Sequence, residues 1–191
     1  MTAYVEDAKD RLIVRNGNAD KRGAITPEFY QSIIDAITGA KERRIRSVII
    51  TSQGGFFCAG GDLNALRERR GLPEVERQGK IELLHDVIRA IRNCPVPVIA
   101  AVKGGAAGAG ASIALACDFI VMEAGAKFTA AYVKAGLVPD GGLTASLARM
   151  ISRPLAMEMC VLARPVTAER MQALGAVNAV VPAEQVMDEA H

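Results

Sequence analysis

The sequence predicts a single α/β domain, because short apolar, largely β-branched runs alternate with segments of helical periodicity. Strands are expected at residues 12–14, 47–51 and 96–102, and a helical segment follows each of them. Half of the 191 residues are hydrophobic, which suits one domain over residues 1–191 with a sizeable core. With five Phe, three Tyr and no Trp, that core should be mainly aliphatic.

The first half of the chain carries recognisable helix-start signals. Thr26-Pro27-Glu28 supplies an N-cap, a proline at the first helical position and an early acidic residue, so we expect a helix over 27–40. A short helix should run over 62–70. A long helix is expected over 74–93, where four apolar residues follow helical spacing: Ile81, Leu84, Ile88 and Ile91.

The second half continues the alternation of strands and helices. Strands are expected at 119–122, 127–129 and 177–181, and helices at 111–117, 144–151, 154–162, 168–174 and from 182 to the end. Thr167 should cap the helix over 168–174, and Gly175 should close it.

The stretch from Pro97 to Asp118 organises the rest of the chain. Its apolar run breaks into four glycines between 104 and 110, and a helix of small residues follows. A strand, a glycine bend and a helix start leave backbone amides free to bind a negative oxygen. The alternative is that these glycines serve only the close packing of a helix on a strand.

A second segment, Ser47 to Leu63, repeats this pattern of buried strand, glycine break and helix start. Two such bends could together hold one oxygen between two main-chain N–H groups. A pocket of this kind is an oxyanion hole, and losing one donor typically costs about 10²–10³ in rate. We therefore expect the two bends to converge.

Composition excludes several other classes of protein. The net charge of +2 gives no global attraction to nucleic acid or to a membrane surface. The four cysteines are widely spaced without a C-x-x-C pair, so we expect reduced thiols and no metal site. The N-terminus lacks an apolar signal region, and the apolar run at 98–117 is interrupted by Lys103 and glycines. A cytoplasmic protein is the expectation.

Three segments, in order, resemble the motifs of the crotonase superfamily, the enoyl-CoA hydratases and isomerases. Phe57-Cys58-Ala59-Gly60-Gly61-Asp62-Leu63 looks like the first motif, Ala100–Gly110 with Ala114–Asp118 resembles the second, and Ala135–Gly142 resembles the third. The resemblance covers about 11–188 and implies a spiral of repeated ββα units that assembles as homotrimers or hexamers. It also implies a C-terminal helical region, which we expect to be short or absent because the sequence stops at His191.

The resemblance implies an enzyme whose substrate is an acyl-CoA thioester, with coenzyme A as part of the substrate and no further cofactor. The amides of Gly61 and Ala109 would be the donors of the oxyanion hole. Other matching positions would contact substrate or coenzyme A: Ala24, Ala59, Gly60, Asp62, Leu63, Gly105 and Tyr132. For Asp62, helix capping is the alternative role.

The side chains that select the reaction depart from the hydratase pattern. Hydratases of the family place glutamates where this chain has Ser112 and Tyr132. Asp140, in the turn Val138–Gly142, is the carboxylate that remains. It could act as an acid/base on an enolate, or as a nucleophile with His85 activating water, as in aryl-CoA dehalogenases. Alternatively, Asp140 closes the turn by bonding to backbone amides.

Three hypotheses about the function are compatible with the sequence. The first is an acyl-CoA isomerase, hydratase or hydrolase, and the run 131–137 resembles a subgroup acting on ring-derived thioesters. The second is a homologue that binds CoA thioesters without chemistry. The third is RNA binding, which the balanced charge does not favour although Arg67, Arg69 and Arg70 are clustered. A dinucleotide fingerprint fails, since Ile113 stands where a third small residue is needed.

Overall fold

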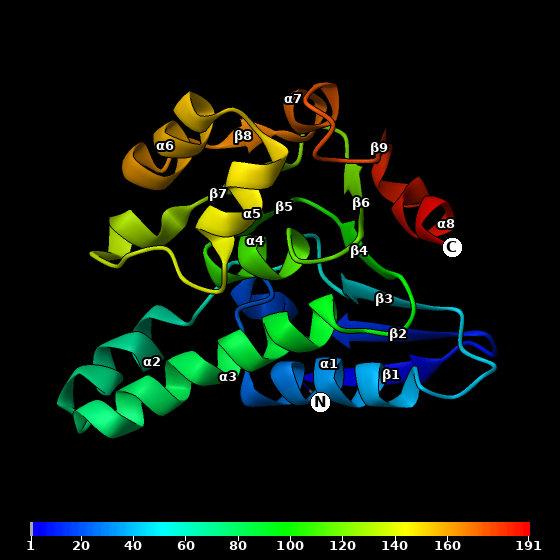
Figure 1. The fold of residues 1–191 in the computed structure, drawn as a ribbon, viewed down its shortest axis with the longest axis horizontal. Helices are drawn as coiled ribbons and strands as arrows, with labels where there is room; N and C mark the ends of the chain where they lie inside the picture. Colours follow the sequence, from blue (N-terminus) through cyan, green and yellow to red (C-terminus); the bar gives the residue numbers. More distant parts are fainter. Residues whose placement is uncertain (1) are drawn as a thin grey trace.

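The computed structural model describes residues 2–191 as a six-stranded sheet with helices on both faces and a smaller three-stranded sheet beside it (Figure 1). The strands are β1 Ala3–Asp7, β2 Arg11–Asn16, β3 Ser47–Ser52, β4 Val98–Val102, β5 Gly105–Ala107, β6 Phe119–Glu123, β7 Lys127–Thr129, β8 Val166–Thr167 and β9 Ala179–Val181. The large sheet has the order β1-β2-β3-β4-β6-β9, and the small sheet has the order β5-β7-β8.

The helices connect these strands in the alternating order that the sequence predicts. They are α1 Pro27–Gly39, α2 Leu63–Glu68, α3 Glu74–Arg92, α4 Ala109–Ala114, α5 Leu143–Met150, α6 Arg153–Leu162, α7 Ala168–Ala173 and α8 Val186–Ala190. Short 3-10 turns lie at η1 Ala19–Lys21, η2 Arg69–Gly71, η3 Ala131–Ala135 and η4 Ala183–Gln185. None of the helices in residues 2–191 is long and apolar enough to cross a membrane.

Strands β2, β3, β4, β6 and β9 pair in parallel, and β1 is added antiparallel to β2 at the edge. Alternate side chains on the central strands enter two separate apolar clusters, as the twofold period of a strand requires. Ile49 of β3 faces α8, whereas its neighbours Val48 and Ile50 face the main core. Burial on both faces explains why these strands are continuous apolar runs.

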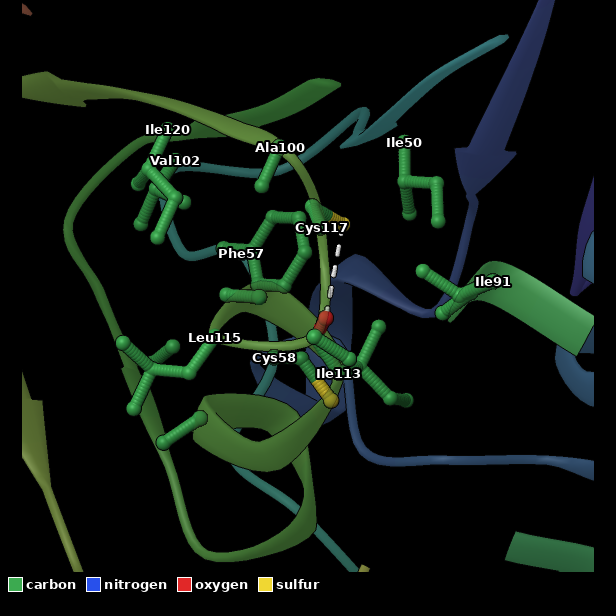
Figure 2. Packing of buried hydrophobic residues seen from close by; sticks show 14 of the residues in the cluster. Ile50, Phe57, Cys58, Ile91, Ala100, Val102, Ile113, Leu115, Cys117 and Ile120 are labelled. Atoms are coloured by element: carbon green, nitrogen blue, oxygen red, sulfur yellow. Dashed lines mark hydrogen bonds between the residues drawn. The ribbon is translucent and has the colours of Figure 1, made fainter. Parts of the chain in front are cut away.

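The main core lies between the large sheet and helices α1, α3 and α4. Phe57, which follows β3, is fully buried at its centre. Figure 2 shows its ring among apolar side chains of β4 and of the segment around α4, including Val102, Ile113 and Leu115. The glycine bend at 58–61, called the first bend below, therefore follows a fully buried aromatic side chain, and the bend at 104–110 is the second.

Several boundaries differ from the sequence prediction. The glycine run after β4 contains strand β5, and α4 begins at Ala109, two residues earlier than expected. Helix α2 ends at Glu68 and continues as the 3-10 turn η2. Ile81, predicted to join the apolar stripe of α3, is 43% exposed, because the buried stripe of that helix begins only at Leu84.

Candidate functional site

The two glycine bends lie against each other, as the sequence predicts. Cys58 forms a parallel bridge with Ala106, and the Ala107 amide donates to the Cys58 carbonyl over 2.9 Å. A Cβ placed on Gly60 would lie 2.8 Å from the Ala107 carbonyl oxygen and 3.3 Å from the Ala109 amide nitrogen. Only glycine permits this approach, and its φ of +90° is one that other residues avoid.

The same closeness recurs one residue into α4. A Cβ on Gly110 would collide with the carbonyl and side chain of Cys58. Burial raises the pKa of the fully buried Cys58 thiol to about 12, so this sulfur stays protonated and acts as a packing group. Because residue 110 is glycine, the start of α4 can pack directly against the first bend.

The amides of Gly61 and Ala109, the two predicted donors, have no hydrogen-bond acceptor within the described part of the chain. Gly61 is exposed and Ala109 is partly exposed, so solvent or a ligand can reach this region. Ala109 is the first residue of α4, whose amide has no partner inside the helix. The arrangement can offer main-chain N–H groups to an oxygen atom.

The segment around Ala24 runs beside the first bend. The Ala59 amide donates to the Arg22 carbonyl over 3.0 Å, and the Ile25 amide donates to the Gly60 carbonyl over 2.9 Å. The Ala24 carbonyl itself accepts from Asn18 Nδ2 over 2.8 Å. Ala24, Ala59 and Gly60 are therefore brought together at one edge of the site.

Asp62 and Leu63 lie at the start of α2, directly after the bend at 58–61. Asp62 caps α2, since its Oδ1 accepts from the amides of Asn64 and Ala65 over 2.8 and 3.3 Å. Its Oδ2 pairs with Lys21 over 2.7 Å, and this hydrogen bond lowers the pKa of Asp62. Leu63 is 60% exposed.

Gly105 lies in β5, next to the second bend. Its φ of +132° and its register opposite Lys127 bring its Cα close to the backbone of β7, where a Cβ would lie 2.5 Å from the Lys127 carbonyl oxygen. In this structure Gly105 serves the pairing of the small sheet.

Tyr132 and Ser112, which replace the expected glutamates, contact each other. Their hydroxyl oxygens are 2.7 Å apart, and the Ser112 hydroxyl donates to the Asp140 main-chain carbonyl over 3.1 Å. Both side chains are buried. Burial, followed by the nearby charge of Asp140, raises the pKa of Tyr132, which keeps the phenol neutral.

Asp140 is placed beside this hydroxyl pair by a tight turn. The following residue, Gly141, has φ +56°, and a Cβ there would lie 2.9 Å from Leu84 of α3 and 3.0 Å from the Ser112 Cβ. Asp140 Oδ1 is buried and has no hydrogen-bond partner among residues 2–191. Within residues 2–191 the Asp140 carboxylate accepts no hydrogen bond from a backbone amide, whereas the Asp140 main-chain carbonyl accepts from the Leu143 amide over 3.2 Å.

His85 is half-buried on α3, one residue after Leu84. Its Nδ1 lies 3.1 Å from Glu82, which also binds Arg89. In the described residues no hydrogen bond joins His85 to Asp140. The structure thus brings the helix that carries His85 to the Asp140 turn, while the ring is engaged by the exposed carboxylate of Glu82.

Tyr30 of α1 belongs to the same region, and the sequence did not single it out. Burial raises the pKa of its phenol, and the nearby charge of Asp140 raises it further. No local signal marked Tyr30, because it reaches the site only through the packing of α1 against the core.

A cavity of about 340 Å³ adjoins the bends. It is lined by Arg22, Phe56, Gly104, Ala107, Lys127, Thr129, Ala131, Lys134 and Pro165. The Arg22 guanidinium lies 4.1 Å above the centre of the Phe56 ring, which holds this cation at the rim. Three cationic side chains make the cavity suitable for an anionic group.

Comparison with known proteins agrees with this geometry. The sequence model of the family "Enoyl-CoA hydratase/isomerase" matches residues 15–191. A crystal structure of an enoyl-CoA hydratase from Polaromonas sp. JS666 superimposes with a TM-score of 0.92 and 45% identity, over 98% of this chain and 74% of that one. A second enoyl-CoA hydratase structure, from Streptomyces coelicolor A3(2), gives a TM-score of 0.92 with 28% identity, over 100% of this chain and 70% of that one.

Curated relatives include a "Probable enoyl-CoA hydratase" from Rhodobacter capsulatus, 38% identical over 91% of this chain and 63% of the relative. The 1,2-epoxyphenylacetyl-CoA isomerase of Escherichia coli is 36% identical over 78% of this chain and 58% of its own length. The chain therefore spans about 60% of these relatives. Sequence and fold together show that the chain belongs to the enoyl-CoA hydratase/isomerase family, the crotonase superfamily.

Proposed function

We propose that this chain transforms an acyl-CoA thioester by stabilising its enolate between the amides of Gly61 and Ala109. The observation that carries the proposal is the contact of the two glycine bends, in which neither amide has an acceptor among residues 2–191. A thioester carbonyl oxygen accepting both amides would gain negative charge as the α-proton leaves. Donors that act on charge developing in the transition state lower the barrier itself.

Asp140 is the proposed acid/base. Its buried Oδ1 has no hydrogen-bond partner in the described chain, so a substrate proton would meet an acceptor that is not already engaged. Removing the α-proton and returning it at another carbon would give isomerisation. Ser112 and Tyr132 lack the carboxyl groups that a hydration mechanism with paired glutamates needs, so we favour isomerase over hydratase chemistry. The named isomerase among the relatives supports this choice.

The cationic cavity would suit the phosphates of coenzyme A, because Arg22 and Lys127 line it beside the bends. We also propose, from the family resemblance, a homotrimer or hexamer located in the cytoplasm. Sedimentation at several protein concentrations measures the first point: a monomer at all of them would contradict it.

The second candidate makes Asp140 a nucleophile. As a dehalogenase it would displace halide from the ring carbon of an aryl-CoA and form an aryl ester, and as a hydrolase it would displace the CoA thiolate and form an acyl-enzyme. Water activated by His85 would then attack the Asp140 carboxyl carbon and release the product. The packing of α3 on the Asp140 turn favours it, through the contact of Leu84 with Gly141. The pairing of His85 with Glu82 disfavours it. Incubation with an aryl-CoA in ¹⁸O-labelled water separates the two, since a nucleophilic Asp140 would acquire the label in its carboxylate.

The test of the first candidate is exchange of the α-protons of an acyl-CoA panel in D₂O, followed by NMR. Wild-type protein should exchange the protons of at least one thioester, and Asp140→Asn should lower exchange to a small residual rate without changing the dissociation constant. Asp35→Asn is the matched control, because Asp35 is an exposed aspartate of α1 whose side chain accepts a hydrogen bond from Gln31. Binding without exchange in the wild type would instead support a CoA-binding homologue without chemistry.

A further inference from the structure

The hydroxyls of Ser112 and Tyr132 make more contacts than they have protons. Ser112 Oγ lies 2.7 Å from the Tyr132 hydroxyl, 3.1 Å from the Asp140 carbonyl oxygen and 3.5 Å from the Gly108 carbonyl oxygen. The Tyr132 hydroxyl lies 3.4 Å from the same Asp140 oxygen. Each hydroxyl carries one proton, so these four contacts cannot all be hydrogen bonds.

The distances select one direction for the two protons. The Asp140 carbonyl also accepts from the Leu143 amide over 3.2 Å, so Leu143 and Ser112 together fill its two lone pairs. The 3.4 Å contact from Tyr132 is then surplus and longer than a normal O–H···O bond. The two shortest contacts are both satisfied when Tyr132 donates to Ser112 and Ser112 donates to the Asp140 main-chain carbonyl.

We infer that Tyr132 and Ser112 form a directed hydrogen-bond chain that positions Asp140 for proton transfer. Ser112 lies three residues after Ala109, so it is one turn of α4 away from a proposed oxyanion-hole amide. Holding the Asp140 carbonyl from that turn fixes the carboxylate relative to the thioester carbonyl. The inference rests on the proposed function, and it makes Ser112 and Tyr132 positioning residues.

The direction of the chain predicts unequal effects of removing its members. Tyr132→Phe leaves the Ser112–Asp140 bond in place, whereas Ser112→Ala leaves the Asp140 carbonyl with the Leu143 amide and the long contact from Tyr132. We expect the rate of α-proton exchange at saturation to fall about tenfold in Ser112→Ala and about threefold in Tyr132→Phe. The dissociation constant of a non-reactive acyl-CoA analogue should not change in either variant.

The decisive experiment repeats both substitutions in the Asp140→Ala background. If the hydroxyls act only through Asp140, they should not change the residual exchange rate there. Tyr4→Phe and Ser32→Ala are matched controls, because Tyr4 bonds to Gln53 on the edge strand and Ser32 is a buried serine of α1. Both controls should exchange at the wild-type rate.

Three results would overturn the inference while leaving the proposed function intact. One is an equal loss of rate in the Asp140→Ala background, and another is a larger loss in Tyr132→Phe than in Ser112→Ala. The third is an unchanged hydrogen–deuterium exchange rate of the Leu143 amide in Ser112→Ala, since a loosened turn should expose that amide. Absence of α-proton exchange in the wild type would refute the proposed function and the positioning role together.

Discussion

Replacing Gly60 by alanine should separate the two glycine bends without altering any side chain near the reacting atoms. The new Cβ would lie 2.8 Å from the Ala107 carbonyl oxygen, where ordinary contact begins at 3.4 Å, so the bends must move apart by about 0.6 Å. The φ of +90° at this position adds backbone strain of about 1–3 kcal/mol.

A shift of this size should move one of the two proposed oxyanion-hole donors out of productive geometry. We expect kcat to fall about 10²-fold and the free energy of unfolding to fall by about 1–3 kcal/mol. Steady-state turnover, or α-proton exchange followed by NMR, measures the first quantity, and denaturant unfolding measures the second. The dissociation constant of the acyl-CoA should change much less than kcat, because the donors act mainly on the transition state.

Gly55→Ala is the matched control for this prediction. Gly55 lies in the same loop, is exposed, and has nothing within 4 Å of an added Cβ. Its replacement should leave kcat unchanged. Wild-type kcat in a folded Gly60→Ala protein would refute the claim that the contact of the two bends forms the site.

Three further predictions concern other parts of the molecule. Replacing Gly79 by alanine should stabilise the protein by about 0.5–1 kcal/mol, because Gly79 is exposed within α3 and nothing lies near an added Cβ. Denaturant unfolding measures this change, and a loss of stability would contradict the prediction. Because burial raises the pKa of Cys58 to about 12, iodoacetamide at pH 8 should modify the half-buried Cys160 and leave Cys58 unmodified until the protein unfolds, as peptide mass spectrometry can show. The hydrogen bond from Lys21 lowers the pKa of Asp62 in the native state below its value in the unfolded state. The ionised Asp62 therefore stabilises the fold above the unfolded-state pKa, and this contribution is lost as the pH falls through the lower native-state pKa. Unfolding free energy measured against pH should therefore fall less steeply in acid for Asp62→Asn than for the wild type.

The central fold could be predicted because its signals are local. Strands β3 and β4 are apolar runs that both faces of the sheet bury, and Thr26 caps α1 through its side chain, as predicted. Strand β5 was missed, because Gly105–Ala107 has no strand propensity and pairs with β7 through its backbone alone. Ile81 was predicted to be buried but is exposed, because helical spacing identifies the apolar face of α3 and does not show where the core against that face ends.

The site could be predicted only where it is built from glycine. The closeness of Gly60 to Ala109 follows from two local motifs whose strands are neighbours in the sheet. The hydroxyl chain joins Ser112 to Tyr132 and Asp140, residues 20 and 28 positions away, so only tertiary packing reveals it. Tyr30 was missed for the same reason.

The most direct test of the account is the infrared stretch of the thioester carbonyl in a bound acyl-CoA labelled with ¹³C at that carbon. Two amides donating to the oxygen polarise the C=O bond, so the labelled band should shift to lower frequency on binding. The shift should be smaller in Gly60→Ala. A band at the same frequency in the complex and in water would contradict the claim that Gly61 and Ala109 hold the carbonyl.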